Sequence, residues 1–436
     1  MTALNDAMNK QRTMSLTLWF FVAAGMLLNA AKLVHHADVQ PYFVDEILNA
    51  QAASTLFREG NYSGWFIGGN FPTGISSGIA ATWVSGLVFL FGGNLFLARL
   101  LTGLFVFAQL LILIFLFARR KFSEPAVAMA VAVILTSLLF HLPYWFGFIQ
   151  SLGEMQGALF VGWGLLILGR CPLLSFFLLG VAVWHCKLMY LPMTGLLIAA
   201  YVVSEEGGWK KKIGAAVKAG LMFMLPMMLW WALIWIRFDL PTVLASTRNY
   251  IGFASGYHSG VSGASPSAGW TLGQRLERLE WANLSLVNRT EMLILFLGPL
   301  VLTAIVLPRY FTWRNGRRDI LLFLAAVTAL LLYMYWYFLV SPMMWVRQVS
   351  PGLYLGFALI FFLAARVRAF FTRTGAAVLG NLILAALVLV VVGETLWVAK
   401  ALPLIQPHMT IARACYQLFN DNCYGGNEHL FKRRPY

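Results

Sequence analysis

Residues 95–121 read LFLARLLTGLFVFAQLLILIFLFARRK, a long apolar run followed by three basic residues. Residues 95–118 carry one charge, Arg99, and are long enough as a helix to cross the ~30 Å hydrocarbon core of a bilayer. The stretch ends in the basic run Arg119-Arg120-Lys121. Because Lys and Arg gather in short loops on the cytoplasmic side, we predict a helix that ends inside.

The composition of the whole chain agrees with a membrane setting. Of the 436 residues, 60% are hydrophobic and 11% are charged, whereas soluble domains are about half apolar and a quarter charged. These values exclude a soluble enzyme, a disordered chain and a coiled coil. The net charge of +15 would suggest nucleic acid in a soluble protein. Here we interpret the excess of Lys and Arg as the signal that orients the chain in the membrane. We expect membrane lipids as partners and no nucleic acid.

Apolar segments recur along the chain, and several of them are shorter than 95–118. We predict an all-α polytopic membrane protein with about 11 transmembrane helices and interfacial helices in its outer loops. The predicted crossings are 15–34, 95–118, 124–142, 154–169, 172–186, 188–203, 213–236, 291–307, 320–340, 351–365 and 376–398.

Five basic clusters set the orientation. They share the inner side only if one crossing lies between the first loop and Arg119, so 74–92 is predicted to lie in the outer interface. The alternative is two crossings within 74–118, which would put Arg119-Arg120-Lys121 outside. The clusters are Lys10 and Arg12; Arg119 to Lys121; Lys210 to Lys212; Arg309, Arg314, Arg317 and Arg318; and Arg366, Arg368 and Arg373.

This topology gives three parts: a cytoplasmic N-terminus (1–14), a single transmembrane domain (15–398) and a short outer tail (399–436). The long outer loops are 35–94 and 237–290. Within the second, 252–269 is rich in Gly and Ser and is either a plain linker or a lid, and 270–290 has the pattern of an interfacial helix. In the tail, Cys415 and Cys423 form either a disulfide or two free thiols.

Two adjacent carboxylates, Asp45 and Glu46, open the helical stretch 45–60 in the first outer loop. One interpretation is structural, with Asp45 capping the helix and Glu46 favouring its positive end. The other is catalytic, with Asp45 as a general base that accepts a proton from a nucleophile. Glu154 begins another segment at the outer edge, where it is either a helix-start carboxylate or a site residue.

Cations from distant parts of the chain are predicted on the same face. Lys187 lies in an apolar region, where its ammonium either snorkels to the interface or binds a phosphate. His185 beside it is an interfacial histidine, a proton carrier or a metal ligand. Arg347 and Arg99 either contact lipid headgroups or bind a phosphate with two hydrogen bonds. A carboxylate to activate an acceptor and cations to neutralise a departing phosphate together suggest group transfer from a lipid phosphate.

In this order, the motifs resemble the glycosyltransferase-C superfamily, in particular its bacterial branch related to protein O-mannosyltransferases and the aminoarabinose transferase of lipid A. The resemblance covers about residues 15–365. It rests on Asp45-Glu46, on Phe71-Pro72-Thr73-Gly74, on the span from Leu97 to Phe105, on Glu154, on Gly180 through Lys187 to Pro192, and on Arg347 with Pro351. The chain departs from the family pattern at Gln348, at Cys186 and in its 38-residue tail.

The resemblance implies a sugar donor carried on a polyprenyl phosphate, used on the outer face of a bacterial inner membrane with inversion at the sugar carbon. It makes Asp45 the base and Lys187 and Arg347 the phosphate ligands. Glu46 and Glu154 would orient substrate or, with His185, hold a divalent cation, because only some members use a metal. The acceptor is left open among a glycan, a lipid and a protein.

Two other functions are compatible with the sequence. One is a transporter or flippase of lipid-linked or small substrates, although no internal repeat of the transporter kind is evident. The other is a different envelope-glycan transferase, an acyltransferase or polymerase, for which His141 or His185 would serve. Walker, HExxH and CxxC motifs are missing from the sequence, which excludes P-loop ATPases and common zinc sites.

Overall fold

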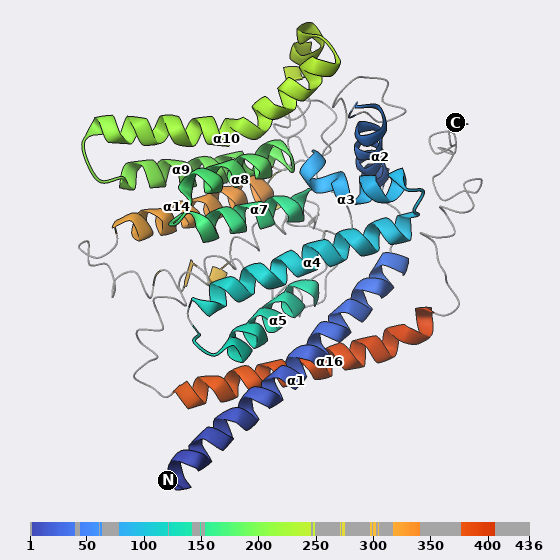
Figure 1. Cartoon of the computed structure of the whole chain (residues 1–436), viewed down its shortest axis with the longest axis vertical. Coiled ribbons are helices and arrows are strands. Elements are labelled where there is room, and N and C mark those ends of the chain that lie inside the picture. The colour runs from blue at the N-terminus through green and yellow to red at the C-terminus, as the bar shows by residue number, and fades with distance from the viewer. Residues whose placement is uncertain are drawn as a thin grey trace.

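The structure is a computed structural model, and every element in the residues it describes is helical (Figure 1). The described residues are 2–39, 44–60, 78–120, 122–141, 153–245, 317–340 and 376–405, together with a few isolated positions between these ranges. Predictions that fall on 252–269, on 275–290, on Arg347 or on the tail cysteines Cys415 and Cys423 lie outside them.

Five helices are long and apolar enough to cross a membrane. They are α1 (Thr2–Val39), α4 (Leu95–Arg119), α10 (Trp209–Arg237), α14 (Arg317–Tyr335), which continues as the π-helix η3 (Trp336–Val340), and α16 (Ala376–Ile405). Shorter apolar helices accompany them: α3 (Ile79–Leu90), α5 (Pro125–His141), α7 (Glu154–Ile167), α8 (Pro172–Trp184) and α9 (Leu191–Ser204).

These helices bear out an α-helical membrane protein, and most of their bounds agree with the predicted segments. The predicted span 95–118 is α4, and the predicted helix 45–60 is α2 (Val44–Glu59). The segment 188–203 differs, because it begins with the 3-10 turn η1 (Leu188–Tyr190), and α9 starts with Pro192 in its first turn. Two of the eleven predicted crossings, 291–307 and 351–365, fall outside the described helices.

The outer surfaces of the long helices are apolar. On α16, Leu382, Leu389 and Leu396 recur at seven-residue spacing and are 61%, 72% and 67% exposed. A continuous exposed row of leucines is unfavourable in water and favourable against lipid chains. The exposed faces of α1 and α16 are therefore the lipid-facing surface of the bundle.

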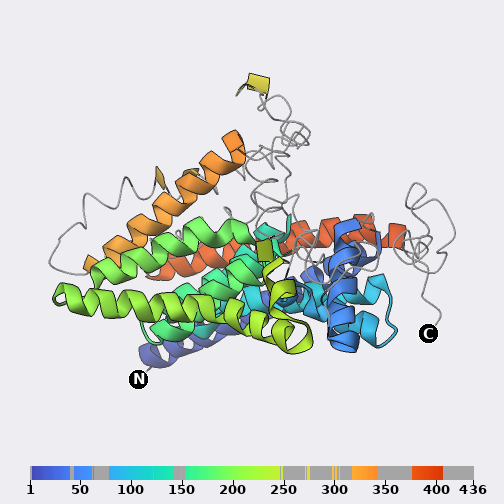
Figure 2. The same ribbon diagram turned by 90° about the horizontal axis from the view of Figure 1, so that it is seen from above.

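The first and last helices pack side by side and run in the same direction (Figures 1 and 2). Contacts between them keep a nearly constant offset, from Met14 against Gly380 to Gly25 against Val391 to Lys32 against Glu394. A constant offset is the signature of parallel helices. The start of α1 and the end of α16 consequently lie at opposite ends of the bundle.

The basic turns in the described residues lie at one end of the bundle. Ser15 of α1 donates a hydrogen bond to Glu124 in the α4–α5 turn, and Arg120 in that turn donates to the Leu166 carbonyl of α7. Figure 1 shows the α9–α10 turn and the starts of α14 and α16 at the same end. This common placement is what the positive-inside pattern requires. We call this end of the bundle the basic end. The opposite end, which contains α2 and α3, is called the acidic-site end.

The short helix α3 stays at the acidic-site end. Its side-chain contacts on α4 are Ser85 with Thr102, at 3.0 Å between their hydroxyl oxygens, and Trp83 with Phe105. Both partners lie within the first eleven residues of α4. Helix α3 thus packs along one half of α4, as the non-crossing interpretation of 74–92 requires.

Candidate functional site

The helix α2 carries the two adjacent carboxylates, and Asp45 is its second residue. The side chain of Asp45 lies outside the description, whereas Glu46 is buried and forms an ion pair with Arg99 of α4. The Arg99 Nε donates to Glu46 Oε1 at 2.9 Å, and its Nη2 donates to Oε2 at 2.8 Å. This two-pronged geometry is the strongest that an arginine and a carboxylate can form.

The Glu46–Arg99 pair joins two elements that the sequence separates widely. Arg99 is fully buried, and Glu46 is 2% exposed. Burial raises the pKa of the Glu46 carboxyl, and the charge and hydrogen bonds of Arg99 oppose this shift. Because Glu46 binds the guanidinium group of Arg99, the two charges neutralise each other. The pair fixes the start of α2 against α4.

Close packing with α3 holds the rest of α2. Gly86 of α3 lies against Ala53, and Arg58 donates to the carbonyls of Phe89 and Leu90 at the end of α3. An arginine at the C-terminal carbonyls of a helix satisfies acceptors that would otherwise have no partner within the helix. Asp45 therefore belongs to a rigid α2–α3–α4 unit.

A second carboxylate and a second cation meet at the starts of α7 and η1. Glu154 Oε1 lies 3.7 Å from Lys187 Nζ, and both side chains are largely buried. This separation is longer than a hydrogen bond, so the contact is an ion pair. Two predicted site residues are thus brought together by the fold.

Local sequence explains how this pair forms. Helix α7 starts at Glu154 because Gly153 adopts a left-handed backbone, with φ of 89°, which side-chain-bearing residues disfavour. Tyr190, at the end of η1, donates its hydroxyl hydrogen to the Glu154 carbonyl and packs over Gly157, which has no side chain to obstruct the ring. These contacts hold the Lys187 turn against the first turn of α7.

His185 occupies the end of α8 and contacts two neighbouring helices. Its Nε2 lies 3.0 Å from the Pro226 carbonyl of α10, and because a carbonyl only accepts, Nε2 carries the hydrogen. Its ring packs edge-on against Trp230. A Cβ on Gly78, which precedes α3, would lie 2.7 Å from the His185 Cα. The backbones of α3 and α8 therefore touch at this point.

This contact joins the two carboxylate-bearing regions. The helix α3 packs on α2, which bears Asp45, and reaches His185, two residues before Lys187. The Glu154–Lys187 pair consequently lies one helix away from α2, at the acidic-site end. Arg347, the third predicted cation, lies outside the described residues.

The three candidate metal ligands each have another partner: Arg99 for Glu46, Lys187 for Glu154, and the Pro226 carbonyl for His185. Within the part of the chain that the structure describes, no group of three or more His, Cys, Asp or Glu side chains is arranged to hold a metal ion.

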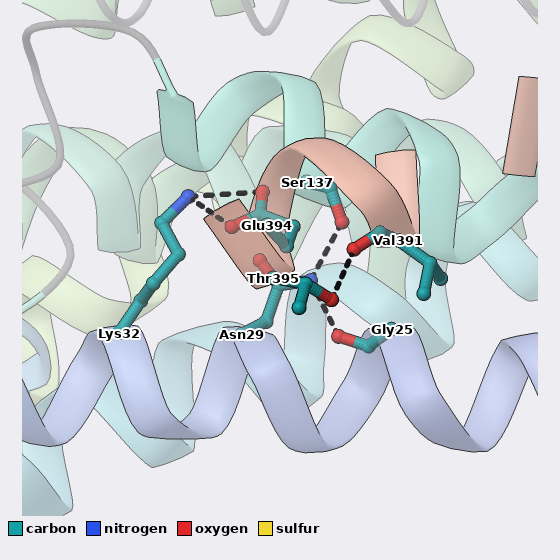
Figure 3. Close-up of polar contacts among 7 residues, drawn as sticks. All are labelled: Gly25, Asn29, Lys32, Ser137, Val391, Glu394 and Thr395. Atoms are coloured by element: carbon teal, nitrogen blue, oxygen red, sulfur yellow. Dashed lines mark hydrogen bonds and ion pairs between the residues drawn. The ribbon is translucent and has the colours of Figure 1, made fainter. Parts of the chain in front are cut away.

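A further buried ion pair, which the sequence analysis did not single out, connects the first and last helices (Figure 3). Lys32 Nζ lies 2.9 Å from Glu394 Oε1 and 2.7 Å from Oε2, and both side chains are 1% exposed. Each residue lies six positions before the end of its candidate span, or about 9 Å along the helix. The sequence contains a signal for both residues, because an ionisable residue within an apolar segment is a functional candidate.

Other polar side chains extend this pair along one face of α1. Asn29 Nδ2 donates to Ser137 Oγ of α5 at 2.6 Å and to the Gly25 carbonyl at 2.8 Å (Figure 3). On the other side of Lys32, the rings of His36 and Trp397 lie 5.1 Å apart. We call Gly25, Asn29, Lys32, His36, Ser137, Glu394 and Trp397 the polar stripe. It binds α1 to both α5 and α16.

The chain matches no protein-family model, no curated protein and no solved structure. The resemblance to the glycosyltransferase-C superfamily is therefore a prediction from short motifs.

Proposed function

We propose that the protein is a membrane glycosyltransferase that moves a sugar from a polyprenyl-phosphate donor to an acceptor on the outer face of the membrane. The observation that carries the proposal is the Glu154–Lys187 ion pair next to the α2–α3–α4 unit. It joins a partly buried cation and a buried carboxylate at the end of an apolar helix bundle. A lipid-linked phosphate needs such a combination, with charge for its headgroup and apolar helices for its tail.

In the proposed reaction, Asp45 accepts the proton of the acceptor hydroxyl or amine. The acceptor atom forms a bond to the anomeric carbon while the bond from that carbon to the phosphate oxygen breaks. The leaving polyprenyl phosphate keeps the bonding electrons, and attack from the opposite face inverts the sugar carbon. Lys187 neutralises the negative charge that develops on the phosphate, with Arg347 as a second ligand.

The carboxylates at the site then have different tasks. Glu154 orients Lys187 through their ion pair. Glu46 acts through Arg99 as a positioning residue that fixes α2 and thereby Asp45. The hydrogen bond from His185 to the Pro226 carbonyl fixes the end of α8 against α10. A divalent metal is not required by this scheme, and a metal-dependent version would draw on Glu46, Glu154 or His185.

The proposal includes about 11 crossings, with the basic end in the cytoplasm of a bacterial cell and the acidic-site end outside. Residues 35–94, which include α2 and α3, would then face the donor in the outer leaflet. The acceptor is a glycan, a lipid or a protein.

Sugar transfer from a polyprenyl-phosphate donor by purified protein tests the assignment. Asp45→Asn is expected to lower the transfer rate about 100-fold or more, because general-base catalysis contributes at least that factor. Lys187→Ala is expected to lower it by a comparable factor through loss of phosphate stabilisation. The matched controls are Asp239→Asn, at an exposed position, and Lys210→Ala, at the basic end. If both site variants keep the control rates, the catalytic assignment is wrong.

A second candidate, a transporter, is favoured by the polar stripe. Buried ion pairs within spans mark substrate or ion pathways in many transporters. Beside the Lys32–Glu394 pair, Asn29 Oδ1 and Thr136 Oγ1 are buried without a hydrogen-bond partner among the described residues. A flux measurement in proteoliposomes separates the two functions: a transporter moves substrate and forms no new glycosidic bond, and its flux would be lost in Lys32→Met.

A further inference from the structure

Two inter-helix turns place arginines together at the basic end. Arg119 and Arg120 end α4, and Arg170 lies in the turn between α7 and α8. Arg120 donates to the carbonyl of Leu166, in the last turn of α7, which draws the two turns together. Arg119 donates to the carbonyls of Phe122 and Ser123 in its own turn.

These hydrogen bonds satisfy carbonyls and leave the positive charges without a counter-charge. No carboxylate within the described residues forms an ion pair with Arg119, Arg120 or Arg170. The nearby carboxylate of Glu124 accepts a hydrogen bond from Ser15. Burial, and then the like charge of Arg170, lower the pKa of the Arg120 guanidinium. Since the turns that carry Arg120 and Arg170 are drawn together, an anion that contacts both arginines would offset their like charges.

The backbone adds to the positive potential. Helix α8 begins at Pro172, two residues after Arg170, and Cys171 before it makes no side-chain capping hydrogen bond. The exposed N–H groups at the start of a helix carry a partial positive charge and favour an anion. Arg120 is also held in place, by the Leu166 carbonyl and by the ring of Phe117, 5.7 Å from its guanidinium carbon. Its remaining donors are consequently pre-oriented.

Apolar surface flanks the arginines on both helices. Leu173 and Leu174, directly after Arg170, are 47% and 49% exposed. On α4, Ile112 and Leu116 are 48% and 37% exposed and lie about two turns and one turn before Arg120, respectively. A ligand that fits this surface has a phosphate for the arginines and acyl chains for the leucine faces.

We propose that Arg120 and Arg170 form a binding site for the phosphate headgroup of an anionic phospholipid, between the α4–α5 and α7–α8 turns. Basic pockets between transmembrane helices on the cytoplasmic side bind such headgroups. The lipid would link the α4–α5 pair of helices to the α7–α8 pair. This site lies at the opposite end from Glu154 and Lys187 and does not depend on the glycosyltransferase proposal.

Native mass spectrometry of the purified full-length protein with added phosphatidylglycerol, and separately with phosphatidylcholine, tests the site. Wild type is expected to retain phosphatidylglycerol preferentially. The Arg120→Gln/Arg170→Gln double variant is expected to bind it roughly 25-fold more weakly, because each basic residue near a membrane surface contributes about a fivefold factor. The control Lys210→Gln/Lys211→Gln removes the same charge from exposed lysines in the first turn of α10 and should bind as wild type does.

Single variants guard against a folding defect. Arg170 is exposed, so Arg170→Gln should fold normally and weaken binding about fivefold, and Arg170→Lys should restore most of it. Three results would overturn the site. The first is equal loss in the lysine control, the second is equal retention of phosphatidylcholine by wild type, and the third is competition by inorganic phosphate as strong as that by the lipid.

Discussion

At the scale of single residues, Glu46 and Arg99 owe their behaviour to burial. Alone, either charge would be too costly in this environment, and together they form two parallel hydrogen bonds between α2 and α4. The adjacent Asp45 and Glu46 therefore receive different roles in our account, although they are neighbours in sequence. Glu46 holds the helix, and Asp45 performs the proposed chemistry.

Removal of one partner of this pair should destabilise the protein strongly. Glu46→Gln leaves the Arg99 guanidinium buried without a counter-charge, and we expect a loss of about 3–5 kcal/mol in the free energy of unfolding. Thermal or denaturant unfolding in detergent measures it. Glu206→Gln, the same change at an exposed position, should shift stability by less than about 0.5 kcal/mol. Equal stability of the two variants would contradict the buried pair.

A glycine at a helix contact gives an independent residue-scale test. A Cβ at Gly78 would lie 2.7 Å from the backbone of His185, so Gly78→Ala should force α3 away from α8 and cost about 1–3 kcal/mol. The matched control is Gly220→Ala in α10, where no atom lies within 4 Å of the added Cβ. That substitution should stabilise the helix by about 0.5–1 kcal/mol. The opposite order of stabilities would show that α3 does not approach α8 so closely.

At the scale of helices, the polar stripe sets how α1 and α16 meet. Small and polar residues at the stripe allow close approach, because Gly25 packs against Val133 and Val391, and Lys32 reaches Glu394 across the interface. Helices in lipid gain little from hydrophobic burial against each other, so such polar contacts select the partner and the register. The stripe therefore accounts for the parallel pairing of the first and last helices.

Charge reversal tests that pairing. Lys32→Met and Glu394→Gln each leave one charge buried in the apolar region, and each should cost about 3 kcal/mol of unfolding free energy. The exchange Lys32→Glu/Glu394→Lys restores opposite charges and should recover part of that loss. Unfolding in detergent, with cross-linking of Gly25→Cys to Val391→Cys as a structural readout, measures both effects. If the exchange variant is no more stable than either single variant, the restored opposite charges recover nothing and the two residues are not coupled.

At the scale of the whole molecule, the parallel helices and the common basic end define a sidedness. Phe91, 83% exposed in the α3–α4 turn, belongs to the acidic-site end, and Glu206 belongs to the α9–α10 turn at the basic end. In intact cells, a membrane-impermeant maleimide should label Phe91→Cys directly and Glu206→Cys only after permeabilisation. These variants are placed in a background in which the native cysteines are replaced. Labelling of both from the same side would contradict the bundle direction.

Sequence reasoning predicts the elements well because each one has a local cause. Apolar length defines α4, and the basic run marks its end. That the segment containing α3 does not cross the membrane stays a prediction, made because only its exclusion brings the basic clusters to one side. Pairings across the chain are different. Nothing near Glu46 in sequence indicates that Arg99 is its partner, and the Lys32–Glu394 pair joins residues from opposite ends of the chain.

The candidate site shows the same limit. Chemical type alone selected Glu154, Lys187 and His185, and the fold brings Glu154 and Lys187 into contact. The same criterion applied to Lys32 and Glu394 would have found the polar stripe. What sequence cannot supply is the partner that decides whether a charge is available for chemistry, because that depends on tertiary packing.

The most direct test of the proposed function is the stoichiometry and stereochemistry of a reaction catalysed by the wild-type protein in proteoliposomes. Our account predicts one free polyprenyl phosphate for each new glycosidic bond, with the anomeric configuration opposite to that of the donor. Donor that crosses the membrane without a new bond, or a product of retained configuration, would contradict it.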